Sequence, residues 1–357
     1  MGTPAKKLSQ LALTARRGVD PEITGLAVDS REVRDGFLFA ALPGTRVHGG
    51  TFIEFALRMG AAAILTDAEG AQIAARELDA SEAALVVVED PRQTLAYTAA
   101  LWFGGQPKTV IAVTGTNGKT SVATFVRQIW AELGHAAVNL GTTGIEGAWS
   151  APLAHTTPEP ITLHRCLAEA VANGVTHAAM EASSHGLEQR RLDGVQLGAA
   201  GFTNFTQDHL DYHDTFEAYF GAKAGLFRRV LPMDGTAVLN LDDPKGADMR
   251  AVAAARGQSV LTVGQGIGDL SLLNQRFDST GQDLRFSWRG KVFQTRLNLI
   301  GGFQAENVLL ACGLVIAGGE DPAHVFETLP HLTTVRGRMQ LAATRKNGAA
   351  VFVDYAH

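Results

Sequence analysis

The stretch VTGTNGKTS, residues 113–121, has the residue types of a phosphate-binding loop. It lies between an apolar run and a run with helical spacing, and the backbone N–H groups of such a turn, together with the helix dipole, favour an anion. Gly115 and Gly118 allow a close approach of the backbone to phosphate oxygens. Lys119 can reach the β- and γ-phosphates, and Thr120 can offer a hydroxyl to Mg²⁺. Because the first glycine of the usual pattern G-x-x-x-x-G-K-[ST] is absent, the loop predicts phosphate binding without indicating a general nucleotide hydrolase.

Further polar groups follow another apolar run. Glu181 ends THAAME, residues 176–181, which has the pattern of a buried strand. Ligands of open α/β sheets bind at the carboxyl ends of strands, where this carboxylate could complete a Mg²⁺ shell; a helix N-cap or a surface acid explains it equally well. The polar run ASSHGLEQRR, residues 182–191, is typical of a binding loop, and its candidate residues are Ser183, His185, Gln189 and Arg191.

Two other segments carry groups that could act on a ligand. TNFTQDHLDYH, residues 203–213, has no spacing that defines a zinc site, so we interpret His209 as a single ligand for a hard ion or as a phosphate contact and His213 as a packed or solvent-facing histidine. Lys223 stands alone in the apolar helical run AYFGAKAGLF. The residues by themselves favour a snorkelling side chain over a desolvated lysine that is carbamylated and binds Mg²⁺.

The elements that position these residues are predicted to form an α/β fold. Over residues 1–105 short apolar runs alternate with helical periods, which indicates a small α/β domain. The same alternation over 106–336 predicts a mostly parallel sheet with helices on both faces. Within it, residues 269–300 have the short alternating runs of antiparallel strands, and a helix is expected over 303–317. Residues 337–357 begin a further sheet.

The composition limits the class of protein. The chain has 357 residues, 46% of them hydrophobic, and its 31 basic and 36 acidic residues give a net charge of -5. This balance argues against a general nucleic-acid or membrane-surface binder. Cys166 and Cys312 have no CxxC partner, which fits a reducing cytosol. We expect neither a signal peptide nor a membrane span.

The motifs taken together resemble the ATP-dependent Mur ligases of peptidoglycan synthesis. The matching stretches run in the order of that family across nearly the whole chain: VDSREVRDGFLFAALPG, AVTGTNGKTS, LGTTG, TTPEP, MEASSHGLEQRR, TNFTQDHLDYH, AKAGLF, LNLDDP, TVRGRM and VDYAH. The short GTNGKTS loop is the form that this family uses. The resemblance implies a UDP-sugar-binding domain at 1–105, a central ATPase domain of the P-loop type at 106–336 with a small antiparallel sheet, and the beginning of a Rossmann-like domain at 337–357.

The resemblance also implies an activity. DSREV and SSHGLEQRR, taken with TQDHLDYH, favour the branch of the family that adds the third residue of the stem peptide over its sister ligases and over folylpolyglutamate synthase. ATP would phosphorylate the D-glutamate γ-carboxylate of UDP-N-acetylmuramoyl-L-alanyl-D-glutamate, and the amine of meso-diaminopimelate or L-lysine would attack the acyl phosphate. We expect meso-diaminopimelate, a cytoplasmic monomer, and neither nucleic acid nor membrane as a partner.

Roles for individual residues follow from the same resemblance. The expected catalytic residues are Lys119, Glu181, His209 and Lys223. One Mg²⁺ would be held by Thr120 and Glu181 and a second by His209 and by Lys223 as N6-carboxylysine. ATP would contact Gly115, Thr116, Asn117, Gly118, Lys119, Thr120, Ser121, Asn307, Arg336 and Asp354. The UDP end of the substrate would contact Val28, Ser30, Thr45, Arg46 and Val47, and the muramoyl-dipeptide end Thr156, Thr157, Ser183, Gln189 and Arg191.

The chain departs from the family pattern in two places. Gln304 stands where the family usually has asparagine, so only Asn307 is assigned there. The third domain of the family, which carries most of the pocket for the incoming amino acid, would continue well past His357, and we therefore expect this chain to bind the UDP-dipeptide but to ligate poorly. The alternatives are a non-catalytic nucleotide- or UDP-sugar-binding fragment, and a general P-loop hydrolase or kinase, for which the DSREV domain would have no use.

Overall fold

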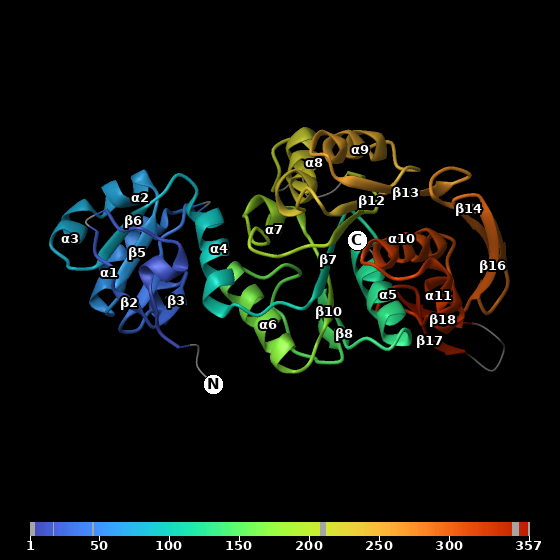
Figure 1. Ribbon diagram of the computed structural model, residues 1–357, viewed down its shortest axis with the longest axis horizontal. Coiled ribbons are helices and arrows are strands. Elements are labelled where there is room, and N and C mark those ends of the chain that lie inside the picture. The colour runs from blue at the N-terminus through green and yellow to red at the C-terminus, as the bar shows by residue number, and fades with distance from the viewer. Residues whose placement is uncertain (1–3, 17, 45, 208–211, 345–349, 356–357) are drawn as a thin grey trace. The chain divides into compact units, whose positions relative to one another are not determined.

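The protein is described by a computed structural model that covers residues 4–16, 18–44, 46–207, 212–344 and 350–355 (Figure 1). The chain forms two compact units. The first consists of residues 1–105, 159–169 and 189–195, and the second of residues 106–158, 170–188 and 196–357.

The first unit is built around a four-stranded parallel sheet. Its strands are in the order β3 (Gly25–Ala27), β4 (Phe37–Ala40), β5 (Ala63–Thr66) and β6 (Ala84–Val87). Its helices are α1 (Ile53–Arg58), α2 (Ala68–Ile73), α3 (Ala75–Asp79) and α4 (Pro91–Phe103), and a short antiparallel pair joins β1 (Lys6–Lys7) to β2 (Glu22–Ile23). Successive strand residues point to opposite faces. Leu38 therefore packs in the cluster that includes residues of α4, and Phe39 in the cluster with residues of α1, α2 and α3.

The second unit contains one ten-stranded sheet in the order β16-β15-β14-β13-β12-β11-β7-β10-β8-β9. Its strands are β7 (Thr109–Thr114), β8 (Ala137–Gly141), β9 (Gly144–Gly147), β10 (His177–Glu181), β11 (Ala199–Phe202), β12 (Thr236–Asn240), β13 (Ser259–Gln265), β14 (Leu270–Phe277), β15 (Gln282–Trp288) and β16 (Lys291–Leu297). In this spatial order, every pair of neighbouring strands from β14 through β7 to β8 is parallel. The predicted mostly parallel sheet is thus confirmed.

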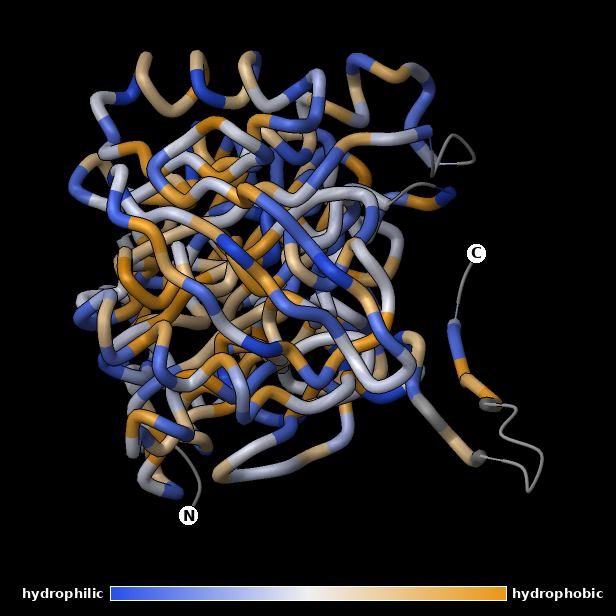
Figure 2. Tube along the Cα trace, turned by 90° about the vertical axis from the view of Figure 1, so that its right-hand side faces the viewer, coloured by the Kyte–Doolittle hydropathy of each residue, from blue (hydrophilic) through white to orange (hydrophobic). Residues whose placement is uncertain are grey.

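The antiparallel strands expected over residues 269–300 are also present. They are β14, β15 and β16, and because β14 pairs with β13 they extend the main sheet instead of standing apart from it. On β15 buried and exposed positions alternate, as expected for a strand with one face on the core. The strands nearest the viewer in Figure 2 show this alternation of hydrophilic and hydrophobic positions.

The helices of the second unit are amphipathic or buried. They are α5 (Lys119–Glu132), α7 (Ser184–Glu188), α8 (Phe216–Gly225), α9 (Gly246–Ala255), α10 (Phe303–Ala317) and α11 (Pro322–Glu327), while α6 (Pro160–Ala172) contributes residues 160–169 to the first unit. Helices α5 and α10 share one hydrophobic cluster, which includes Trp130 and Leu314. The chain then continues into the antiparallel pair β17 (Gln340–Thr344) and β18 (Ala350–Val353). Among the described helices, none has both the length and the apolar composition needed to cross a bilayer.

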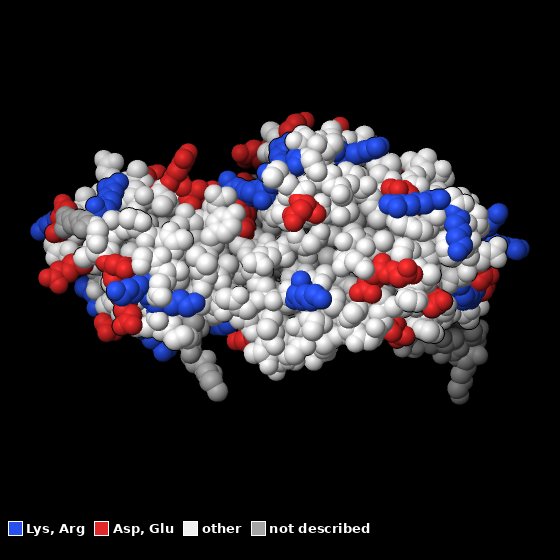
Figure 3. Space-filling view, viewed as in Figure 1, with Lys and Arg blue, Asp and Glu red and all other residues white. Residues whose placement is uncertain are grey.

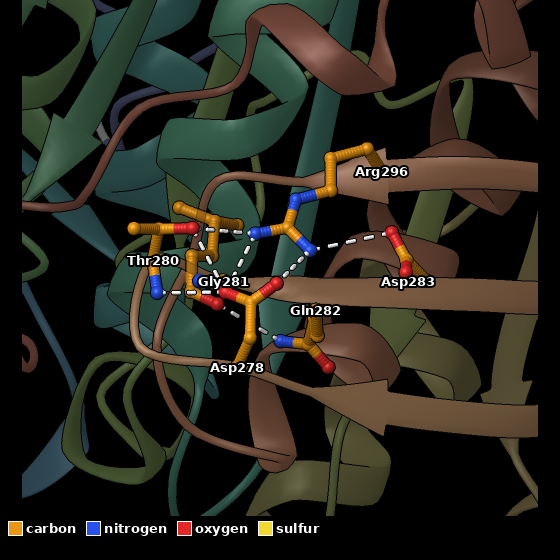
Figure 4. A network of polar contacts seen from close by, with 7 residues as sticks. Asp278, Thr280, Gly281, Gln282, Asp283 and Arg296 are labelled. Atoms are coloured by element: carbon orange, nitrogen blue, oxygen red, sulfur yellow. Dashed lines mark hydrogen bonds and ion pairs between the residues drawn. The ribbon is translucent and has the colours of Figure 1, made fainter.

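Charged side chains hold the turn between β14 and β15 (Figure 4). The Asp278 carboxylate accepts hydrogen bonds from the Arg296 guanidinium at 2.6 and 2.8 Å and from the backbone N–H of Thr280 at 2.7 Å. The hydrogen bonds from Arg296 hold the pKa of Asp278 well below its usual range. Because exposed ion pairs contribute little to stability, we assign this network to fixing the turn. Elsewhere on the face shown in Figure 3, acidic and basic side chains are interspersed.

One histidine of the first unit is buried without a polar environment. His164, on α6, is 1% exposed, and neither ring nitrogen has a hydrogen-bond partner among the described residues. A Cβ atom added at Gly194 would lie 2.7 Å from its Nε2, which shows how closely the chain is packed against the ring. Burial lowers the pKa of His164 from 6.5 to about 4, because the charged form is excluded from an apolar site.

Acid is therefore expected to destabilise the protein partly through His164. Between pH 6.5 and 4 the unfolded chain protonates this group and the folded chain does not, so the free energy of unfolding falls as the pH falls. The variant His164→Leu should lose a contribution on the order of 3 kcal/mol to this decline. Urea unfolding of the variant and the wild type at pH 7.5 and at pH 4.5 measures the difference. Replacement of the exposed His155 by leucine is the control, and equal pH dependence of His164→Leu and the wild type would contradict the prediction.

Candidate active site

The glycine-rich loop joins the central strand β7 to helix α5, at the carboxyl edge of the sheet. Gly115 and Gly118 have φ values of 146° and 86°, a region that disfavours other residues. A Cβ atom at Gly115 would lie 1.8 Å from the Thr203 hydroxyl oxygen, and one at Gly118 would lie 2.6 Å from Oδ1 of Asn307. Both glycines are therefore required by conformation and by packing.

The rest of the loop is held from the segment after β11. Asn204 accepts hydrogen bonds from the backbone N–H of Thr116 with its carbonyl at 2.8 Å and from that of Asn117 with its Oδ1 at 2.9 Å. The Lys119 ammonium donates to the carbonyls of Gly115 at 2.9 Å and of Thr116 at 2.8 Å, so it lies over the loop. The first-turn N–H groups of α5, which have no helical acceptors, begin at the same point. This combination of a cation and a helix N-terminus is suited to phosphate oxygens.

Glu181 and Thr120 are brought together across the sheet. The Thr120 hydroxyl donates to Oε2 of Glu181 at 2.9 Å, and the backbone N–H of Thr142 donates to Oε1 at 2.8 Å. Glu181 is 3% exposed and Thr120 is 5% exposed. Strands β7 and β10 are parallel neighbours, so the loop after one and the last residue of the other share an edge. The hydroxyl and carboxylate oxygens are the hard donors that Mg²⁺ prefers, and the two residues fit the metal role that the sequence predicted.

Lys223 is buried below the same loop. It is 1% exposed, its ammonium donates to the Gly115 carbonyl at 2.7 Å, and it lies 4.4 Å from the centre of the Tyr219 ring. The interpretation that the residues alone favour, a Lys223 side chain that snorkels to solvent, is therefore wrong. A carbamate on Nζ would keep one N–H, so the hydrogen bond to Gly115 is compatible with the modification. His209, the other predicted ligand of the second ion, lies outside the described residues.

A pocket of about 200 Å³ opens beside Thr120. Its lining consists of Thr120, Thr142, Thr143, Arg336, Arg338 and Tyr355. Four hydroxyl residues and two guanidinium groups can bind phosphate or carboxylate oxygens. The Arg338 guanidinium donates to the Tyr355 carbonyl at 2.9 Å, which ties the two sides of the C-terminal hairpin. The predicted residue Asp354 does not line this pocket, and its carboxylate accepts a hydrogen bond from the backbone N–H of Met339 at 2.8 Å.

Three residues predicted for the muramoyl-dipeptide end surround Glu181. The Thr157 hydroxyl donates to the Glu181 carbonyl at 2.9 Å and accepts from the backbone N–H of Ser183 at 3.0 Å. The Thr156 and Thr142 hydroxyls are 3.1 Å apart. Hydroxyl groups from two segments of the chain therefore lie next to Glu181, with Thr157 itself buried.

The other residues predicted to bind the substrate belong to the first unit. Val28 and Ser30 follow strand β3, with Ser30 9% exposed at the start of a short 3₁₀ helix. Gln189 accepts hydrogen bonds from Nε and Nη2 of Arg191 at 3.2 and 2.7 Å. Of the loop residues, Arg46 and Val47 are exposed, and Thr45 lies outside the described residues.

Comparison with known proteins identifies the family. Residues 113–315, more than half of the chain, match the model of the Mur ligase middle domain, and residues 22–102 match that of the Mur ligase family, catalytic domain. The chain belongs to the Mur ligase family. It is 46% identical to the UDP-N-acetylmuramoyl-L-alanyl-D-glutamate--2,6-diaminopimelate ligase of Caulobacter vibrioides, over 99% of this chain and 72% of that protein. Identity to the ligase of the same name from Bradyrhizobium diazoefficiens is also 46%, over 94% of this chain and 68% of that protein.

A solved structure of a ligase with the same name is also similar to this chain. The structure of a UDP-N-acetylmuramoyl-L-alanyl-D-glutamate--2,6-diaminopimelate ligase superposes with a TM-score of 0.79 at 30% identity, over 91% of this chain and 66% of that one. The expected family and α/β fold are thereby confirmed, and the protein is a ligase of the acid–amino-acid class by family.

Several residues of this Mur ligase site were not predicted from the sequence. They are Thr142, Thr143, Thr203, Asn204, Tyr219 and Arg338. Four of them lie within LGTTG and TNFTQDHLDYH, so the motifs marked their segments without separating ligand contacts from loop supports. Arg338 follows the predicted Arg336 in TVRGRM and lines the same pocket.

Helix α10 and the first turn of α5 carry further residues that were predicted to contact ATP. Asn307 is 9% exposed, and its side chain lies against the loop at Gly118. Gln304, where the family usually has asparagine, is fully buried one turn earlier. Ser121 is buried in the first turn of α5. These positions put the start of α10 beside the phosphate loop of the Mur ligase.

Proposed function

We propose that the protein catalyses the ATP-dependent addition of meso-diaminopimelate to the D-glutamate γ-carboxylate of UDP-N-acetylmuramoyl-L-alanyl-D-glutamate. The names of the relatives at 46% identity give the substrates. The observation that carries the proposal is the buried Thr120–Glu181 pair, of which Thr120 lines a pocket that is also lined by two arginines. A site of this kind suits an anionic phosphoryl group and an anionic acceptor.

The reaction proceeds in two balanced steps. An oxygen of the γ-carboxylate attacks the γ-phosphorus of ATP and forms an oxygen–phosphorus bond. The bond between the γ-phosphorus and the oxygen of the β-phosphate breaks, and ADP leaves. The neutral amine of diaminopimelate then attacks the acyl carbon. Phosphate leaves with the bonding electrons, and the nitrogen loses a proton as the amide forms. The acyl phosphate intermediate thus supplies the driving force that a free carboxylate lacks.

The chain's own residues orient the two anions. Lys119 and the first turn of α5 bind the phosphates, and their fixed positive charge stabilises the charge that develops on the transferring group. Arg336 and Arg338 face the same pocket and would hold a carboxylate or phosphoryl oxygen. Two Mg²⁺ ions, one at Thr120 and Glu181 and one at His209 and carbamylated Lys223, would neutralise charge on the phosphoryl group when bound.

The remaining assignments complete the proposal. The uridine end would contact Val28, Ser30 and the loop from Thr45 to Val47, and the dipeptide end Thr156, Thr157, Ser183, Gln189 and Arg191. Asn307, Arg336 and Asp354 would contact ATP. We propose that the protein acts in the cytoplasm as a monomer.

Calorimetric titration with UDP-N-acetylmuramoyl-L-alanyl-D-glutamate tests the substrate assignment. Compared with plain UDP, the dipeptide substrate should bind at least about tenfold more tightly, which corresponds to about 1.4 kcal/mol. Arg191→Met should remove most of this preference, whereas Arg58→Met, at an exposed position on α1, should leave it unchanged. Equal affinity for UDP and for the dipeptide substrate in a folded sample would overturn the assignment. Rapid ATP hydrolysis without the UDP substrate would favour a P-loop hydrolase instead.

A further inference from the structure

Three potential metal ligands meet at the end of the sheet opposite the phosphate loop. His177 is the first residue of β10, whose last residue is Glu181, and five residues of extended chain place these ends about 13 Å apart. His135 lies between the end of α5 and the start of β8, and Glu320 lies between α10 and α11. Because β8 and β10 are parallel neighbours, the segments that enter them share this edge.

The side chains converge closely. His135 Nε2 is 2.8 Å from Oε1 of Glu320, and the ring centres of His135 and His177 are 4.1 Å apart. One ligand atom from each of the three residues lies within 4.8 Å of the others. A Zn²⁺ ion with ligand distances of roughly 2.0–2.2 Å needs its donor atoms closer to one another than 4.8 Å. Small rotations of the three side chains can bring the donor atoms together. Two ring nitrogens and a carboxylate oxygen from three different segments are therefore already gathered around one point.

The surroundings favour ligation. The Thr176 hydroxyl is 2.8 Å from Nδ1 of His177 and orients the ring, as outer hydrogen bonds orient metal-bound histidines. His177 is 7% exposed, while the side chains of His135 and Glu320 are 31% and 24% exposed, so an ion can enter from solvent and still be partly enclosed.

A hydrogen-bonded ion pair between His135 and Glu320 is the simpler alternative. It accounts for the 2.8 Å contact, but it uses only one of the two imidazoles that face each other. A divalent ion uses both imidazoles and the carboxylate together.

We propose that His135, His177 and Glu320 form a site for one Zn²⁺ ion or a similar first-row divalent ion, with water at the fourth position. Two histidines and a glutamate are an established donor set for zinc, and nitrogen ligands exclude Mg²⁺ as the preferred occupant. The ion joins the end of α5, the start of β10 and the turn after α10, so its role is structural. The inference is independent of the proposed ligase reaction, because none of these residues belongs to the candidate active site.

Titration of the metal-free protein with ZnCl2 tests the proposal. Excess MgCl2 in the buffer competes with zinc for oxygen ligands such as those of Thr120 and Glu181. We expect one ion per chain, and binding at least about tenfold weaker in Glu320→Gln, which keeps the size and a hydrogen bond of the glutamate. His135→Gln should show the same loss. His155→Ala removes an exposed histidine outside the cluster and should bind zinc like the wild type.

Two further readouts separate the site from unspecific binding. Co²⁺ should give the visible absorption of a four-coordinate ion with the wild type and not with Glu320→Gln. Zinc should raise the melting temperature of the wild type but not that of the variant, and equal melting temperatures of the two metal-free proteins show that the variant is folded. Equal zinc affinity in the wild type and Glu320→Gln, or no binding by the folded wild type, would overturn the proposal.

Discussion

Replacing Glu181 by glutamine is expected to slow phosphoryl transfer from ATP by about 10²–10³-fold, the effect typical of removing one charge-stabilising group. Glutamine can still accept the hydrogen bond from the Thr142 N–H and can donate to the Thr120 hydroxyl, so the local structure should remain. Only the negative charge that attracts Mg²⁺ is lost. ADP formation in the presence of the UDP-dipeptide, followed as a function of Mg²⁺ concentration, measures the effect, and the Mg²⁺ dependence should shift to higher concentration.

The control for this variant is Glu54→Gln, an exposed glutamate on α1 that is paired with Arg58. It makes the same chemical change away from the site and should leave both the rate and the Mg²⁺ dependence unaltered. Mg²⁺-dependent binding of ATP, measured in the same samples, provides a readout that does not require turnover. A Glu181→Gln protein with an unchanged Mg²⁺ dependence would show that this carboxylate does not hold the ion.

Replacing Lys223 by methionine is expected to slow acyl phosphate formation severely. Methionine fills much of the space of the buried lysine stem, but it cannot donate to the Gly115 carbonyl and cannot form a carbamate. The effect should reach the 10²–10³-fold range, and bicarbonate should not restore activity. Carbon-13 NMR after addition of labelled bicarbonate should show a carbamate signal in the wild type that Lys223→Met lacks.

Lys223→Arg separates the two roles of this lysine. Arginine retains an N–H donor for the Gly115 carbonyl, but its guanidinium stays protonated and cannot be carbamylated. ATP binding should therefore survive while phosphoryl transfer is lost. Lys245→Met, at a half-buried lysine paired with Asp248, is the control for unspecific loss of a cation. Near-normal phosphoryl transfer by Lys223→Arg would eliminate the carbamate and leave Lys223 as a support of the loop.

The elements were predictable because their signals are local. Apolar runs such as TVIAVT and helical periods such as SVATFVRQIWAE can be recognised without their partners, and they appear as β7 and as most of α5. The short strand β9 and the joining of β14 to the main sheet were not predicted. Both depend on which strand lies next in space, and hydrophobic periodicity does not encode strand order.

The candidate site was predictable to the extent that its chemistry lies in continuous motifs. GTNGKTS indicates the phosphate loop, and the residues alone leave Glu181 open between a Mg²⁺ ligand and a helix N-cap or surface acid. The structure places its carboxylate 2.9 Å from the Thr120 hydroxyl, and its role as a metal ligand stays a prediction. Arg338 and Thr142 were missed because a motif does not show which of its side chains point into a pocket. His209 stays a prediction.

The sequence by itself determined the loop and the family. Gly115 and Gly118 act through their backbone, and Lys119 acts through an ammonium that donates to the carbonyls of Gly115 and Thr116. The predicted phosphate loop therefore follows from neighbours in the chain. The tertiary structure alone decided which distant groups meet. It buried Lys223 under a loop 108 residues away and gathered His135, His177 and Glu320 at one edge. The physical reason is that such contacts depend on strand order and on packing between helices and sheet, which are set by the cooperative burial of the whole core and by no single stretch of sequence.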